Sequence, residues 1–106
     1  MKDDILSNSK SIISGDKLWD KKAINELTRG GSDIKDWSKM SSKYQYETQY
    51  GKGEFHYYQN KVTGEISTFD AKMKIIKSKS LWSDKTRAEY YILDVDTNFN
   101  ALGVRK

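Results

Sequence analysis

The stretch that most restricts the fold is residues 53–70, GEFHYYQNKVTGEISTFD, because it joins two strand-like runs through a short turn. Residues 54–60 and 65–76 are rich in aromatic and β-branched side chains, and the segment NKVTGE between them contains the turn-forming pair Thr-Gly. Two such runs joined by so few residues predict an antiparallel β-hairpin. His56, the single histidine of the chain, lies in its first strand.

The hairpin can close in two registers. A four-residue loop would pair Asn60 with Glu65 and would place His56 on the apolar side of the second strand. A three-residue loop would pair Lys61 with Glu65, and Gly64 would then take the left-handed position of a G1 bulge. Glycine suits that position because it has no Cβ to clash at positive φ. We therefore favour the three-residue loop.

This register separates an apolar face from a polar face, because side chains alternate along a strand. The expected core face carries Phe55, Tyr57, Phe69, Ala71, Met73 and Ile75. The opposite face would collect a histidine, carboxylates, hydroxyls and cations, namely Glu54, His56, Tyr58, Thr68, Asp70, Lys72 and Lys74.

The first part of the chain, residues 1–43, is predicted to be helical. Residues 16–28 approximate one apolar stripe, with Ser14 or Asp16 as N-cap and Gly30 and Gly31 at the C-terminal end. A shorter helix is expected over 33–40, where apolar residues recur every three positions, and residues 3–13 would form another helix or fray. Trp19, Trp37 and Trp82 are expected to anchor the core.

The second part, residues 44–106, is predicted to be mainly antiparallel strands, at 44–50, 54–60, 65–76 and 86–96. The chain of 106 residues is one domain in this interpretation. The expected fold class is α+β, with N-terminal helices packed on a four-stranded antiparallel sheet.

Composition narrows the function without fixing it. The chain has 19 Lys and Arg against 15 Asp and Glu, a formal charge of +4, which suits a polyanionic partner such as RNA or DNA. No cysteine is present, which excludes disulfides, thiolate zinc sites and a cysteine nucleophile. No apolar run is long enough to span a membrane. The start MKDDILSNSK is not a signal peptide, so export would depend on a larger parent chain.

The polar face has the groups that RNA cleavage by its own 2′-hydroxyl requires. His56 titrates near neutrality and can be base or acid, and Glu54 or Asp70 can supply or orient the second proton-transfer group. Lys72 or Arg87 can hold the phosphate, and Thr68 and Tyr58 add hydroxyls. Further nucleic-acid contacts are expected from Lys74, Arg87, Lys77 and Lys79. Tyr57 and Tyr58 offer rings on which bases can stack, although the favoured register turns Tyr57 inward. This reaction needs no metal, and no cofactor is expected.

A plainer interpretation competes with this one. Any two-faced sheet shows polar residues on one side, and a strand histidine is more often incidental than catalytic. Lysines near residues 72–79 also deter edge-to-edge aggregation. The alternative function is therefore a non-enzymatic binding module for protein or nucleic acid.

Residues 30–75 resemble the C-terminal toxin domains of bacterial polymorphic toxins, of the contact-dependent inhibition, Rhs/WapA-like and LXG types. The similarity lies in GSDIKDW, EFHYYQNKVTGE and DAKMKI. It implies a metal-independent ribonuclease, with tRNA among the RNA substrates, that is secreted within a larger effector and acts in the cytoplasm of a target bacterium. It also implies a cognate immunity protein. The matching positions are His56, Tyr58, Asp70 and Lys72.

The segment YYQNKVTGE is also similar to the hairpin of WW domains. Trp37 lies far upstream of the position that a WW domain requires, Phe69 replaces its second tryptophan, and the closing proline is missing. A proline-binding groove would lack one aromatic wall. The likeness is therefore one of turn chemistry only.

Overall fold

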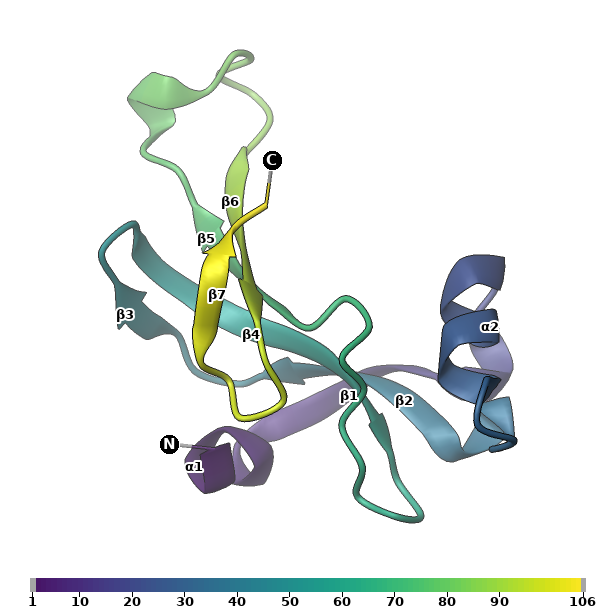
Figure 1. The fold of residues 1–106 in the computed structure, drawn as a ribbon. Helices are drawn as coiled ribbons and strands as arrows, with labels where there is room; N and C mark the ends of the chain where they lie inside the picture. Colours follow the sequence, from purple (N-terminus) through teal and green to yellow (C-terminus); the bar gives the residue numbers. More distant parts are fainter. Residues whose placement is uncertain (1, 106) are drawn as a thin grey trace.

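The computed structural model describes residues 2–105, which form one seven-stranded antiparallel sheet with two short helices (Figure 1). The sheet order is β1-β2-β4-β5-β6-β7, and β3 pairs with the start of β4. The strands are β1 (Ser9–Ser14), β2 (Trp37–Ser42), β3 (Tyr46–Thr48), β4 (Gly51–Asn60), β5 (Lys72–Ile76), β6 (Tyr90–Val95) and β7 (Ala101–Val104). The helices are α1 (Lys2–Ser7) and α2 (Lys21–Thr28), and the 3₁₀ helices are η1 (Gly15–Lys17), η2 (Ile34–Asp36) and η3 (Lys79–Leu81).

The expected fold, N-terminal helices on a four-stranded sheet, is wrong. The segment predicted to be helical contributes two strands, β1 and β2, and the C-terminal segment adds β7. Both N-terminal strands, SKSIIS and WSKMSS, consist largely of serine and lysine. Such residues do not mark a strand by propensity, so the pairing of β2 with β4 decides their conformation.

The spacing of Ile34, Trp37 and Met40 predicts a helix over residues 33–40, but only η2 is helical there. Trp37 and Met40 belong to one strand and are an odd number of residues apart, so they point to opposite faces of the sheet. Trp37 packs with α2, whereas Met40 joins the core around Phe55. The three-residue recurrence therefore reflects two separate cores.

Helix α2 begins later than expected. Asp20 caps it, because its Oδ1 accepts the backbone N–H groups of Lys22 and Ala23, and neither Ser14 nor Asp16 does so. Gly31 follows the helix with φ of +96°, as expected for a glycine just beyond a helix C-terminus. The helix buries Ala23 and Leu27 against the sheet.

The hairpin tip has the four-residue loop, so the favoured pairing of Lys61 with Glu65 is wrong. The backbone N–H of Asn60 donates to the carbonyl of Glu65 at 2.8 Å. The side-chain oxygen of Asn60 accepts the N–H groups of Val62 and Thr63, which stabilises the wider loop. Gly64 does have positive φ, +82°, as predicted.

The register changes between the tip and the body of this hairpin. Residues 67–71 leave the ladder, with Asp70 at φ of +55°, and β4 then pairs with β5 as Phe55 with Met73 and His56 with Lys72. The pairing differs from the predicted one by two residues, so the same residues face the core. Phe69 is the exception, because it lies in the irregular segment and packs near Tyr58, 6.0 Å between ring centroids.

Two apolar clusters lie on opposite faces of the sheet. The larger one is covered by α1 and the loop after β6, where Phe99 contacts Phe55 and Tyr57 edge to face at 5.1 and 5.0 Å. The smaller one lies under α2 and contains Ala23, Leu27, Trp37 and Tyr58. In Figure 1 the two helices lie at opposite ends of the sheet. The face that α2 covers in part is the polar one.

Of the three tryptophans expected in the core, only Trp37 is buried, at 3% exposure. Its Nε1–H donates to Ser32 Oγ at 2.9 Å. Trp82 is half-buried in the loop between β5 and β6, and Trp19 is 90% exposed. The prediction was therefore wrong for Trp19 and Trp82.

Candidate functional site

We call the sheet surface opposite Phe55 and Tyr57 the polar face. It is formed by alternate residues of β2, β4, β5 and β6, which pairing places side by side. Its members are Lys39, Glu54, His56, Tyr58, Lys72, Lys74 and Asp94. The grouping of Glu54, His56, Tyr58, Lys72 and Lys74 on one face agrees with the prediction from alternation.

His56 lies at the middle of the polar face. It pairs with Ser41 on one side and Lys72 on the other, and is 8% exposed. Its Nε2 lies 3.0 Å from Glu54 Oε1, and the Glu54 side chain is 41% exposed. Burial lowers the pKa of His56, and the hydrogen bond with Glu54 opposes that shift only in part.

These contacts assign the proton on the ring. With a lowered pKa, His56 is neutral at pH 7, and a carboxylate can only accept a hydrogen bond. Nε2 therefore carries the hydrogen, which leaves the lone pair on Nδ1. The pair can take up a proton at Nδ1, and the Glu54 carboxylate would then stabilise the imidazolium.

Three lysines flank this pair in the sheet, and the ammonium of Lys74 lies over the Tyr90 ring, 4.6 Å from its centroid. Lys72 is directly opposite His56 and Lys74 opposite Glu54, while Lys39 is opposite Tyr58 on β2. Burial, followed by the charge of Lys72, lowers the pKa of Lys39, and Lys74 adds to the effect. Within residues 2–105, Lys39 forms no ion pair. Clustered cations with an unpaired member are suited to bind an anion.

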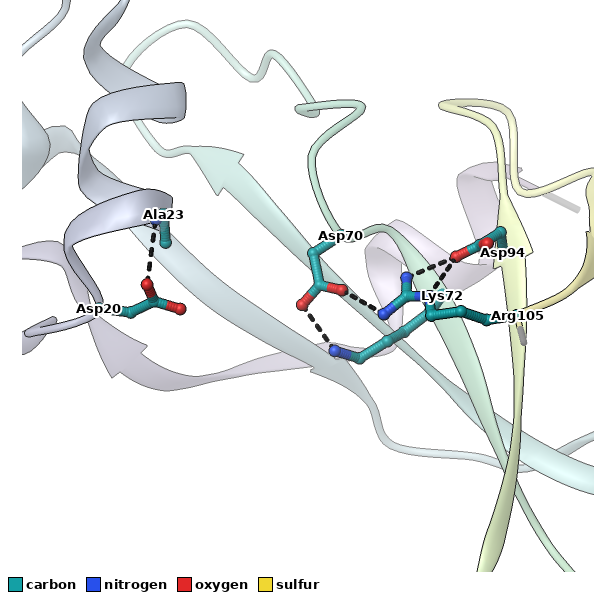
Figure 2. A network of polar contacts seen from close by, with 6 residues as sticks. All are labelled: Asp20, Ala23, Asp70, Lys72, Asp94 and Arg105. Carbon is teal, nitrogen blue, oxygen red and sulfur yellow. Dashed lines mark hydrogen bonds and ion pairs between the residues drawn. The ribbon is translucent and has the colours of Figure 1, made fainter.

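Asp70 has a structural part in this arrangement. Its two oxygens bind Lys72 Nζ at 2.6 Å and Arg105 at 2.8 Å, and Arg105 also donates to Asp94 (Figure 2). Burial alone would raise the pKa of Asp70, but the hydrogen bonds from Lys72 and Arg105 lower it overall. The carboxylate is thus ionised and fully engaged, so it positions Lys72 and is ill-suited to donate a proton.

The other expected site residues divide into two groups. Tyr58 lies on the polar face but is buried beneath α2, and burial raises the pKa of its phenol. Thr68 is exposed in the irregular segment before Asp70 and lines a shallow hollow with Asp94 and β7. Tyr57, expected to contact bases, is 1% exposed and belongs to the larger core.

The predicted phosphate contacts at Arg87, Lys77 and Lys79 lie away from the polar face, in the loop that projects beyond β5 and β6 (Figure 1). Lys77 is 3.9 Å from Glu89 and lies over the ring of Tyr91. Arg87 and Lys79 are exposed. Of the predicted nucleic-acid contacts, the structure therefore brings only Lys74 to His56.

Sequence reasoning missed Lys39 and Arg105. Lys39 reaches the site because residues 37–42 form a strand rather than a helix, which places it beside Tyr58. An alternation test applied to that segment would have grouped Trp37, Lys39 and Ser41 on one face. Arg105 follows β7, a strand that was not predicted, and no local signal indicates its ion pairs.

No protein-family model, curated protein or solved structure matches this chain. The resemblance to polymorphic toxin domains therefore depends on the sequence pattern alone. None of the helices within residues 2–105 is long and apolar enough to cross a membrane. The same residues hold no cluster of three His, Asp or Glu side chains arranged for a metal ion.

Proposed function

We propose that this domain is a metal-independent endoribonuclease of the polymorphic-toxin type, with His56 as the general base. The observation that carries the proposal is the His56–Glu54 hydrogen bond flanked in the sheet by Lys39, Lys72 and Lys74. It places a proton acceptor that is neutral at pH 7 near cations that can stabilise the charge of the phosphate in the transition state. The sequence resemblance points to the same reaction.

The reaction proceeds by attack of the RNA on itself. His56 Nδ1 removes the proton from a 2′-hydroxyl, and the 2′-oxygen forms a bond to the adjacent phosphorus. The bond from phosphorus to the 5′-oxygen breaks, which yields a 2′,3′-cyclic phosphate and a 5′-hydroxyl. Lys39, whose pKa is lowered, donates the proton to the leaving 5′-oxygen, while Lys72 and Lys74 stabilise the phosphate charge.

The biological setting is part of the proposal. The resemblance supports delivery as the end of a larger secreted effector, action on RNA such as tRNA in the cytoplasm of a target bacterium, and neutralisation by a cognate immunity protein. A basic domain is suited to RNA, since the formal charge of +4 favours association with a polyanion.

The test is digestion of 5′-labelled tRNA at pH 7 in excess EDTA, with product ends identified by mass spectrometry. Wild type should yield cyclic phosphate ends. H56A should cut about 10²–10⁴-fold more slowly, since a positioned base contributes that much. K39A should also be impaired, whereas K79A, in the distant loop, is the matched control and should cut normally.

Circular dichroism on each variant separates loss of chemistry from loss of fold. Full activity in folded H56A would show that the histidine is incidental. If wild type binds RNA but leaves it intact in every condition tested, the chain is the binding module that is the alternative to the enzyme.

A further inference from the structure

Trp19 is held in solvent by its two neighbours. Leu18 packs against the smaller apolar cluster, and Asp20 caps α2 through the N–H groups of Lys22 and Ala23. The residue between them is directed outward, and Trp19 is 90% exposed. Most of the large apolar indole therefore faces solvent.

The indole borders a hollow that reaches the polar face. This hollow has a volume of about 400 Å³, and its lining residues are Ile13, Leu18, Trp19, Asp20, Lys39 and Tyr58. It is an open hollow and not an enclosed cavity, which suits a stacked base with one free face. Four of the six lining residues are apolar or aromatic, and Lys39 is the cation among them. Asp20 is the one acid, and its Oδ1 is occupied by the start of α2.

Lys39 connects the hollow to His56. Lys39 lies opposite Tyr58 on the neighbouring strand. His56 is on the same face of β4, two residues or about 7 Å from Tyr58 along the strand at the usual rise. The charge of Lys39 acts on His56, and the charges of Lys72 and Asp20 act on Lys39. An RNA chain that enters over Trp19 therefore passes Lys39 before it reaches His56.

We propose that Trp19 is a stacking platform for one base of single-stranded RNA, and that Lys39 binds the phosphate next to that base. A flat apolar ring beside a cation matches the two parts of a nucleotide, and base–aromatic stacking tolerates any sequence. An apolar peptide would leave Lys39 without a partner. This subsite rests on the proposed function, because the phosphate that Lys39 binds is the one whose leaving 5′-oxygen it protonates, next to His56.

The test separates binding from cleavage by using a fluorescein-labelled 2′-O-methyl hexaadenylate, which has no free 2′-hydroxyl and so cannot be cut by this reaction. Anisotropy at low salt gives its Kd. W19A should weaken binding about 5- to 100-fold, since one stacked base contributes that much to affinity. W19F should retain part of the affinity, because phenylalanine still offers a ring for stacking. V62A is the control and should bind normally, because Val62 is an exposed apolar residue at the distant hairpin tip.

Tryptophan emission gives an independent measurement. The unlabelled oligonucleotide should quench wild type and W82F, and W19F should lose the quenching. Unchanged affinity in W19A, quenching that persists in W19F, or no binding by wild type would each overturn the subsite. If H56A still cleaves RNA while W19A fails to bind the oligonucleotide, the subsite holds and the catalytic proposal fails.

Discussion

Replacing Gly15 by alanine should separate η1 from η2, which meet where β1 ends and β2 begins. Gly15 starts η1 and is buried against η2. A Cβ at this position would lie 1.7 Å from the carbonyl oxygen of Ile34 and 2.7 Å from that of Trp37. Both contacts are backbone atoms, so no side-chain rotation relieves them. Reaching an ordinary contact distance requires a backbone movement of about 1.5–2 Å.

The expected cost follows from that geometry. Overpacking a filled interior costs typically about 1–3 kcal/mol, and a fixed backbone neighbour places Gly15→Ala at the upper end, about 3 kcal/mol. For a domain of this size each kcal/mol lowers Tm by roughly 4–8 °C. Gly15→Ala should therefore melt more than about 10 °C below wild type.

Thermal and urea unfolding, followed by circular dichroism, measure this difference. Gly30→Ala is the matched control, because a Cβ there meets nothing within 4 Å and its φ is not in the left-handed region. It should be neutral or stabilise by about 0.4–1 kcal/mol, since alanine restricts the unfolded chain. The reasoning is refuted if Gly15→Ala unfolds within about 0.5 kcal/mol of wild type, the range of ordinary surface changes.

Two further predictions concern His56 and the tryptophans. The folded state lowers the pKa of His56, so the unfolded chain binds more protons just below pH 6.5, and the free energy of unfolding should fall as pH drops through that value. Urea midpoints at pH 7.5 and 5.5 measure the fall, which His56→Gln should reduce; an equal fall in both proteins would contradict the assignment. Trp37→Ala should lower the free energy of unfolding by about 3–5 kcal/mol, because Trp37 is buried. Trp19→Ala should change it by less than about 0.5 kcal/mol, because Trp19 is exposed, and urea unfolding measures both values. Similar losses in both variants would contradict these burial assignments.

The central strand could be predicted from sequence because its information is local. Residues 54–60 alternate, and the favoured register assigned Phe55 to the core and His56 to the polar face; these faces are correct because the observed pairing with β5 differs from the predicted one by an even number of residues. The exact pairing could not be obtained in the same way. It depends on the Asn60 side chain, which closes the loop, and on residues 67–71, which leave the ladder.

The first two strands carry only a weak local signal, because serine and lysine, which are not strand formers, make up four of the six residues in each. β2 lies between β1 and β4, so long-range pairing decides its conformation. Because β2 was not predicted, Lys39 was not assigned to the site. Trp19 was misplaced for a different reason: burial was inferred from residue type, whereas its exposure follows from the fixed positions of Leu18 and Asp20.

The two outer strand pairs differ from those inside the sheet. β1 shifts register against β2 between Ser11 and Ile13, and β7 shifts against β6 near Val95, with Gly103 at φ of +148°. The pairings of β2 with β4 and β5 with β6 run continuously. Bulges twist an edge and interrupt its row of free N–H and C=O groups. The β1 and β7 edges are thus poor templates for another strand, so the sheet resists edge-to-edge growth at these two edges.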